Sequence, residues 1–452
     1  MQTIAETAPR IKALTVSPVD LTRECLARAA AGRELNIFTA LREREAVEEA
    51  EEAAREIRKG AYRGPLHGIP VAIKDLVDVR GMPTTSGSAL PAPVARADAP
   101  TVLRLREAGA IVIGKTNLHE FAFGTTSEET AFGPVRNPRD PSRSAGGSSG
   151  GSGAALVAGM CLGAIGTDTG GSVRIPAAAC GIVGLKPTIG ELTCDGVVPL
   201  STTLDHIGPM ARTVSDVGML FQAMKGTTVR GVAAAGGTLT FGLPGGYFMQ
   251  PLDSDVRAMI ERLQHALRAR GHAIIHVDMP HAEWTADVYL HIVLPEAAAF
   301  HARRLETFGD RYSPGVRLRL EMGRYVLAED YVRAMRLRQI LTDDVDRALR
   351  ICDVLLLPAM AIPAPPIGAS TVEVEGVTQP VRASMLKLTQ LFNMTGHPAI
   401  VLPGGDGRDG LPRALQLVGH RGRTERLLDI AAAVERDGQI VAGPGSVGGG
   451  TG

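Results

Sequence analysis

The sequence predicts an α/β fold in which helices cover both faces of a sheet. Its 452 residues are enough for one large domain or two to three small ones. Apolar residues make up 44% and charged residues 21%, values ordinary for a soluble globular protein. Helical and strand-like segments alternate along most of the chain. Such alternation is typical of α/β domains with a largely covered sheet.

The first part of the chain contains two predicted helices. Ser17 fits an N-cap, Pro18 suits the first turn, and Asp20 completes a capping box. A second helix is expected over residues 42–59, because its apolar residues recur at helical spacing and Gly60 follows as a stop.

The alternation then continues to the C-terminal part. "HGIPVAIKDLVDV" is a short apolar run with β-branched residues, which predicts a buried strand. "TVLRLREAG" predicts a helix and "AIVIG" the strand after it. Later helices are expected at "RTVSDVGMLFQAM" and "DSDVRAMIERLQHALRARG", and strands at "TLTFGLP", "AIIHV", "DVLLLPA" and "AIVLPG".

Two further regions complete the predicted organisation. Residues 280–350 are expected to be mostly helical and are rich in Tyr, which indicates ordinary helix packing first and a helical cap or substrate-pocket wall as the alternative. Residues 441–452 are a Gly-rich tail that we expect to be disordered. The domain itself is expected to span residues 1–440.

Composition excludes several classes of function. Lys plus Arg equals Asp plus Glu, so the chain lacks the positive charge of a protein that grips nucleic acid or an anionic membrane. No apolar run approaches the ~20 residues that span a bilayer, and no signal peptide is evident. The five cysteines form no CxxC pair and indicate reduced thiols. We therefore expect a cytoplasmic protein, and the sequence leaves room for a homodimer.

One motif imitates a nucleotide site. Residues 109–116, "GAIVIGKT", match the phosphate-binding pattern GxxxxGK[ST]. In a true phosphate-binding loop the middle residues form a loop, whereas Ala-Ile-Val-Ile here indicates a buried strand. Lys115 is therefore interpreted as a structural or surface lysine.

The glycine- and serine-rich run "AGGSSGGSGAA" has two further misleading interpretations. Its Gly146–Gly150 portion matches GxSxG, the nucleophile elbow, but that motif follows a strand and "RNPRDPSRSA" is not expected to form one. A flexible linker is disfavoured too, because the apolar segment "AALVAGMCLGAIG" follows directly and is expected to be buried. A glycine-rich loop entering a helix more often brings the backbone close to a ligand or another segment.

Three segments together contain the parts of an acyl-transfer site. Lys74 ends a predicted buried strand, and the carboxyl ends of strands are where α/β sheets bind ligands. Taken alone, Lys74 would be expected to pair with Asp75 or reach solvent. With "GGSSGG" and "GTDTGGS", however, it supplies a base for a serine, because burial favours the neutral amine. Glycines would let backbone amides approach a developing oxyanion. These residues predict a serine hydrolase without fixing which serine attacks.

The chain resembles the amidase signature family from about Ser17 to about Arg436. The most specific part runs from Gly146 to Gly190, "GGSSGGSGAALVAGMCLGAIGTDTGGSVRIPAAACGIVGLKPTIG". "GIPVAIKDL", "GAIVIGKTNLHEFAFG" and "LDHIGPMARTV" match in order and spacing. The resemblance implies a single large domain with a mixed sheet and an acyl-enzyme route to amide hydrolysis. Because the serine and lysine set is complete and no His/Cys/Asp cluster has ligand spacing, we expect no metal or organic cofactor.

The resemblance also implies roles for particular residues. Ser172 would be the nucleophile, Ser148 a bridging serine with a cis peptide bond, and Lys74 the base. The oxyanion hole would be formed by the amides of four consecutive residues, Thr169, Gly170, Gly171 and Ser172. Thr167, Asp168 and Arg174 would hold this loop in shape. Gly124, Thr125 and Ser149 match the family motifs less specifically and are expected to line the site.

Three members of this family remain to be weighed. The first is a stand-alone amidase that cleaves small or aryl amides, with carbamates and esters also open to it. The second is the glutaminase component of a tRNA-dependent amidotransferase, its A subunit. The third, an inactive scaffold, is disfavoured because all three triad residues are present. The glutaminase components carry a "YDGxRYG"-like segment, and the nearest stretch here, "RYSPGVRLRL", does not fit it. The stand-alone amidase, acting on a small-molecule amide or carbamate without contacting nucleic acid, is therefore favoured.

Overall fold

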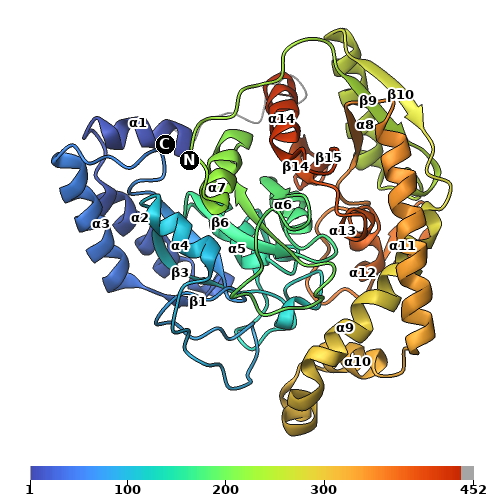
Figure 1. Ribbon diagram of the computed structural model, residues 1–452, viewed down its shortest axis with the longest axis horizontal. Helices are drawn as coiled ribbons and strands as arrows, with labels where there is room; N and C mark the ends of the chain where they lie inside the picture. Colours follow the sequence, from blue (N-terminus) through green and yellow to red (C-terminus); the bar gives the residue numbers. More distant parts are fainter. Residues whose placement is uncertain (1, 439–452) are drawn as a thin grey trace.

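An eleven-stranded sheet runs through the protein in the computed structural model, which describes residues 2–438 (Figure 1). The strand order is β1-β3-β2-β6-β8-β7-β14-β15-β11-β9-β10. In chain order the strands of this sheet are β1 (Phe38–Leu41), β2 (Pro70–Lys74), β3 (Ile111–Thr116), β6 (Gly163–Asp168), β7 (Val183–Lys186), β8 (His206–Ala211), β9 (Thr240–Pro244), β10 (Ala273–Val277), β11 (Val354–Pro358), β14 (Ala399–Asp406) and β15 (Pro412–Val418). The predicted tail at 441–452 lies outside the described residues.

The sheet is mixed, as the family resemblance implied. Strand β2 pairs in parallel with β3 and β6, whereas β8 runs antiparallel to β6 and β7. At the other end, β9 pairs in parallel with β10 and β11. The carboxyl ends of β2 and β6 therefore meet at one edge, where Lys74 and Asp168 end their strands.

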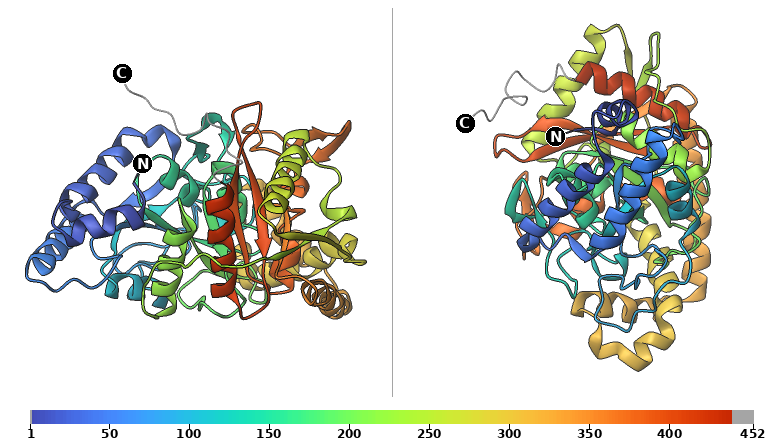
Figure 2. Two further views of the ribbon diagram at one scale, coloured as in Figure 1. Left: turned by 90° about the horizontal axis from the view of Figure 1, so that it is seen from above. Right: turned by 90° about the vertical axis from the view of Figure 1, so that its left-hand side faces the viewer.

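Helices lie on both faces of the sheet (Figures 1 and 2). Residues three apart in a strand point to opposite faces. A side chain on Gly163 would meet Leu220 of α7, and one on Gly166 would meet Ser149 and Val173, at the starts of α5 and α6. Helices α4, α8 and α14 contact α7 or one another and so share its face. The helices are α1 (Ile4–Lys12), α2 (Pro18–Ala31), α3 (Glu43–Arg58), α4 (Pro100–Glu107), α5 (Gly150–Val157), α6 (Arg174–Cys180), α7 (Val214–Lys225), α8 (Ser254–Ala269), α9 (Thr285–Phe308), α10 (Pro314–Gly323), α11 (Ala328–Leu349), α12 (Val381–Leu386), α13 (Gln390–Met394) and α14 (Thr424–Gly438).

The predicted helices and strands form close to their expected limits. Ser17 caps α2 by accepting a hydrogen bond from the amide of Asp20, but this is the only half of the predicted capping box that forms among the described residues. The helix expected over 42–59 is α3, whose buried face consists of four alanines and Ile57. Each strand predicted from an apolar run is present in the main sheet.

One expectation about the chain before Gly146 is wrong. "RNPRDPSRSA" does form strands, since β4 (Arg136–Asn137) pairs with β5 (Asp140–Ser144) in a separate two-stranded ribbon. The prolines do not prevent this, because both strands of a two-stranded ribbon are edge strands, in which a residue without an amide donor is tolerated. The ribbon lies outside the main sheet, so a nucleophile elbow still lacks the strand it requires. A second small ribbon joins β12 (Thr371–Val374) and β13 (Val377–Pro380).

The false phosphate-binding motif is a buried strand, as predicted. Residues Ile111–Thr116 form β3, and every one of them is buried. Lys115 is fully buried and pairs with Asp75 at 2.9 Å, so it is structural and the surface alternative is excluded. Asp75 is therefore not the partner of Lys74.

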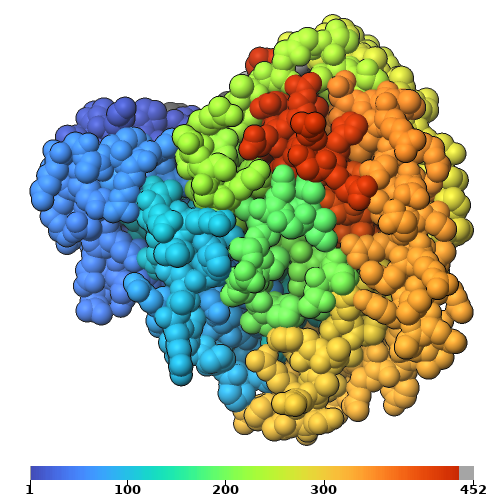
Figure 3. Space-filling model, viewed as in Figure 1, coloured from blue at the N-terminus to red at the C-terminus, as the bar shows by residue number. Residues whose placement is uncertain are grey.

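The region from 280 to 350 is helical, as expected. Helices α9, α10 and α11 pack on one another and enclose a second apolar cluster beside the sheet. In Figure 3 these helices, coloured yellow to orange, lie below and to the right of the green central part of the molecule. Within residues 2–438 no helix is both long and apolar enough to cross a membrane.

Candidate active site

Lys74 and Ser148 meet at the carboxyl end of β2. The Nζ atom of Lys74 lies 2.7 Å from the Oγ of Ser148 and 2.7 Å from the Oγ1 of Thr167. Both Lys74 and Ser148 are completely buried. Two residues separated by 74 positions are thus in direct hydrogen-bond contact, as the family resemblance implied.

Burial changes the charge of this lysine. Removal from water lowers the pKa of Lys74 to about 7, although the carboxylates of Asp168 and Asp205 favour the charged form. The neutral form of Lys74 is therefore accessible near neutral pH. A neutral amine has a lone pair that accepts a proton, which an ammonium group lacks.

The peptide bond that precedes Ser148 is cis, as the resemblance implied. The three residues expected to line the site make the following contacts. The backbone of Thr125 packs against Gly147, leaving no room for a side chain there. Ser149 ties the two loops together, because its amide donates to the carbonyl of Ser172 and its hydroxyl to that of Thr167. A side chain on Gly124 would overlap the ring of His119, so this glycine is required for packing.

The loop from 169 to 172 presents four amides that donate to no acceptor among residues 2–438. Its carbonyls, in contrast, are held. The carbonyl of Asp168 accepts from Asn393, that of Gly170 from Thr389, and that of Gly171 from the amide of Ile175. In a trans peptide unit the carbonyl and the next amide point in opposite directions. Anchoring the carbonyls therefore fixes the directions of the free amides of Thr169, Gly171 and Ser172.

Ser172 ends this loop and differs from the other two triad candidates. It is 6% exposed, whereas Lys74 and Ser148 are 0% exposed. Its hydroxyl forms no hydrogen bond within residues 2–438, while its backbone carbonyl is held by Ser149. The structure thus combines a fixed backbone with an uncommitted hydroxyl at this position.

Asp168 and Arg174 form a buried ion pair behind the loop. The guanidinium donates to both carboxylate oxygens, at 2.9 and 3.0 Å, and Asp168 also accepts the amides of Val173 and Arg174. Burial opposes ionisation of Asp168, but Arg174 and Asn393 overcome this and hold its pKa below the usual range. Arg174 further donates to the carbonyl of Thr389 and to Gln416. The pair therefore connects the loop to the C-terminal part of the chain, which fits the loop-holding role expected for it.

Arg174→Met should destabilise the protein strongly. It leaves the Asp168 carboxylate buried without its cation, and breaking a buried pair in this way costs about 3–5 kcal/mol. Urea unfolding followed by circular dichroism measures the loss. Arg333→Met is the matched control, because the Arg333–Asp330 pair is exposed and is expected to contribute less than about 1 kcal/mol. An Arg174→Met protein as stable as this control would contradict the assigned role.

Several residues at the site were not identified from the sequence. Thr167 was expected only to shape the loop, yet its hydroxyl contacts Lys74. Asp205 accepts a hydrogen bond from Thr169, and burial raises its pKa to about 6. The hydroxyl of Tyr289, on α9, would meet a side chain placed on Gly170. Thr167 and Asp205 belonged to recognised motifs, but no motif contained Tyr289.

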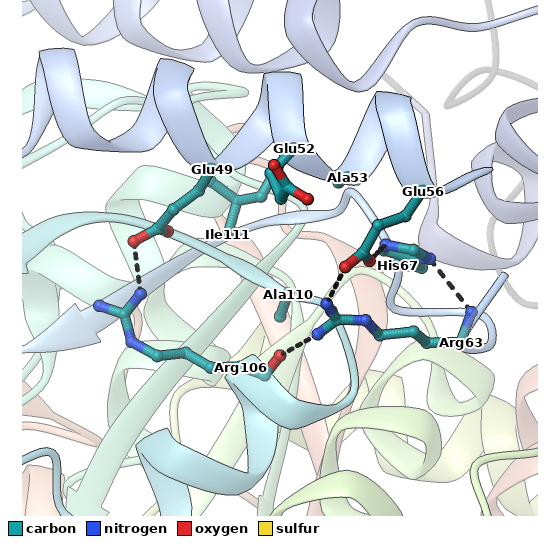
Figure 4. Close-up of a pocket in the computed structure, with 10 residues that line it drawn as sticks. Glu49, Glu52, Ala53, Glu56, Arg63, His67, Arg106, Ala110 and Ile111 are labelled. Atoms are coloured by element: carbon teal, nitrogen blue, oxygen red, sulfur yellow. Dashed lines mark hydrogen bonds and ion pairs between the residues drawn. The ribbon is translucent and has the colours of Figure 1, made fainter. Parts of the chain in front are cut away.

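A charged hollow of about 150 Å³ lies between α3, α4 and the chain before β2 (Figure 4). Its side chains bind one another: Glu49 pairs with Arg106 at 2.6 Å, and Glu56 pairs with Arg63 at 2.6 Å and with His67 at 3.1 Å. His67 precedes the amino end of β2, whereas Lys74 lies at the carboxyl end. The hollow is therefore at the opposite edge of the sheet from the serine and lysine cluster, and its ion pairs are structural.

The chemistry available at the cluster is that of serine and lysine. Among residues 2–438 no three His, Cys, Asp or Glu side chains are grouped to hold a metal ion. The cysteines in this part of the chain are unpaired thiols.

Known proteins are similar to this chain in sequence and in fold. The Amidase family model matches residues 20–428. An amidase from Pseudomonas putida is 37% identical over 429 residues, which cover 91% of this chain and 91% of the relative. The crystal structure of an amidase matches 96% of this chain and 99% of its own, with a TM-score of 0.92 and 38% identity. The A-type component of the glutamyl-tRNA(Gln) amidotransferase from Thermotoga maritima matches 93% of this chain and 91% of its own, with a TM-score of 0.76 and 31% identity.

Proposed function

The chain belongs to the amidase signature family and is a hydrolase of carbon–nitrogen bonds in amides, and from this we propose that it is a stand-alone amidase of small or aryl amides with a Ser172–Ser148–Lys74 triad. The observation that carries the proposed triad is the contact of a buried lysine of lowered pKa with Ser148, close to a loop of free amides.

The proposed reaction begins with a proton relay. Neutral Lys74 accepts the proton of Ser148, and Ser148 accepts the proton of Ser172. The Oγ of Ser172 attacks the carbonyl carbon of the amide, and the electron pair of the C=O bond moves to the oxygen. Amides of the 169–172 loop donate to that oxyanion, a contribution worth about 10²–10³-fold in rate per donor.

The intermediate then collapses. The C–N bond breaks, the leaving nitrogen takes the proton held by Lys74 through Ser148, and the acyl group remains on Ser172. Water attacks the acyl-enzyme with the same relay as base and releases the carboxylic acid. Esters and carbamates can follow this route as well, because it requires only a carbonyl with a leaving group.

The second candidate function is that of the glutaminase component of a tRNA-dependent amidotransferase. The similarity to the Thermotoga maritima protein favours it. Two observations favour the stand-alone amidase instead. The TM-score of 0.92 to an amidase exceeds the 0.76 to that protein. The segment Arg311–Leu320 also lacks the "YDGxRYG" pattern.

A direct assay separates the two functions. The purified chain, without added protein, is incubated with glutamine and with a panel of simple amides and anilides. Release of amine from the panel at rates above that from glutamine is expected. Turnover confined to glutamine, or turnover that appears only when a partner protein is supplied, would favour the amidotransferase component.

A further inference from the structure

Arg382 is a cation without a protein counter-ion. Within residues 2–438 it forms no ion pair and donates no hydrogen bond, and its guanidinium lies over the ring of Phe123, 5.8 Å from the centroid. Burial and the neighbouring charge of Arg319 lower the pKa of Arg382 to about 10, so it remains charged at neutral pH. A partly buried charge of this kind is costly unless an anion accompanies it.

The neighbouring arginine is already neutralised. Arg319 lies over the same Phe123 ring, 5.3 Å from its centroid, and pairs with Glu129 at 3.0 Å. Glu129 also accepts from the amide of Gly315 and pairs with His119, so its oxygens are committed. The carboxylate of Glu120 also attracts Arg319, but its oxygens accept hydrogen bonds from two serines. Among the described residues, Arg382 is therefore the arginine of this pair without a direct partner.

Leu386 and Tyr289 connect Arg382 with the candidate active site. Leu386 lies four residues further along α12, and residues at this spacing share a helix face. Leu386 and the hydroxyl of Tyr289 both lie against Gly170, within the proposed oxyanion loop. Burial raises the pKa of the Tyr289 phenol, and the charge of Arg382 is the largest influence that opposes this rise. Figure 1 shows α12 and α13 between the central β6–α6 segment and helix α11.

We propose that Arg382, supported by Arg319 and Phe123, binds a carboxylate of the substrate, so that the preferred amides are small monoanionic ones. The planar guanidinium fits a carboxylate through two parallel hydrogen bonds. A single guanidinium without a direct partner matches a planar, singly charged group, which favours a carboxylate over a phosphate dianion. This inference rests on the proposed amidase function of the same site and narrows its substrate class.

The kinetic test compares charged and neutral amides of equal length. The charged series is malonamate, succinamate and glutaramate, and the neutral series is propanamide, butanamide and pentanamide. The wild-type kcat/KM should favour the charged member of at least one pair by tenfold or more. Arg382→Met should reduce that preference about 10–100-fold, mainly through KM, since it removes a charged hydrogen-bond pair. Arg382→Lys should restore part of it.

Arg317→Met is the matched control, because Arg317 belongs to α10 but pairs with the exposed Asp310. It should leave the preference as in the wild type. Equal kcat/KM within every pair for the wild type, or equal losses on charged and neutral amides in Arg382→Met, would overturn the proposal.

A binding measurement keeps this inference separate from the proposed function. Malonate, succinate and glutarate are titrated into Ser172→Ala and into Ser172→Ala/Arg382→Met by calorimetry, with no turnover required. At least one diacid should bind the first protein at least tenfold more tightly than the second. Equal or absent binding in both proteins overturns the carboxylate subsite even if amides are hydrolysed. Binding without hydrolysis of any amide by the wild type contradicts the proposed amidase instead.

Discussion

Ser172→Ala is expected to abolish amide hydrolysis while leaving the fold intact. Loss of a serine nucleophile can reduce kcat by about 10⁶-fold. The hydroxyl of Ser172 forms no hydrogen bond within the described residues, so its removal should change the free energy of unfolding by less than about 1 kcal/mol. Steady-state assays on an anilide, beside a thermal unfolding curve, measure both effects.

The control for this variant is another serine. Ser142 is exposed on β5, where its hydroxyl bonds Asp140, and Ser142→Ala should retain wild-type turnover. A second readout is covalent labelling: a sulfonyl fluoride should transfer its sulfonyl group to Ser172, with release of fluoride, and peptide mass spectrometry locates it. Activity of Ser172→Ala above a few per cent, or labelling of a different serine, would assign the nucleophile elsewhere.

Replacement of Lys74 should have the next largest effect. Lys74→Ala removes the proposed base and should slow amide acylation about 10²–10⁴-fold. Esters should lose less, because their leaving group needs less help from a proton. Lys74→Arg should also fail, since a guanidinium stays charged and cannot accept the proton. Stopped-flow acylation with an anilide and an ester of the same acid measures the difference. Lys74→Arg with most of the amidase activity would exclude the relay.

The pH dependence tests the same base. Lys74 acts only when neutral and its pKa lies at about 7, so kcat/KM should fall tenfold per pH unit below pH 7. Asp205, with a pKa of about 6, is a second group that titrates near this range. Asp205→Asn separates the two. It removes a carboxylate that favours charged Lys74, so the fall of kcat/KM with decreasing pH should begin at a lower pH. If kcat/KM of the variant no longer fell at acid pH, the fall would belong to Asp205 instead of Lys74.

Strand geometry explains why Lys74 does not pair with Asp75, the partner that its neighbourhood in the sequence suggests for an isolated lysine. The apolar run before it predicts a buried strand, and the structure has β2 there. Neighbours in sequence suggested pairing with Asp75, yet adjacent strand residues point to opposite faces. Asp75 therefore pairs with Lys115 of β3, and Lys74 meets Ser148 and Thr167. Local pattern predicts the strand, whereas the register between strands decides the partner.

The groups that hold the amide loop were beyond sequence reasoning for a related reason. Thr389 and Asn393 anchor the carbonyls of Gly170 and Asp168, but each lies more than 200 residues away in the chain. Nothing in the local sequence around α13 marks Thr389 and Asn393 as partners of that loop. The same holds for Arg382, whose missing counter-ion is visible only after α10 and α12 are brought to Phe123. The family resemblance identified the motif residues, whereas the residues that hydrogen-bond to them were visible only in the tertiary structure.

The anchoring of Gly170 by Thr389 also sets when the enzyme can first act during its synthesis. These two residues are 219 positions apart. At roughly 5–20 residues per second, a ribosome needs about 10–40 s to pass from one to the other. Throughout this interval the nascent chain carries Ser172 without the partner that orients the adjacent amides. The protein should thus emerge as a latent precursor and gain activity only near chain completion, and a ribosome stalled before Thr389 should hold an inert one.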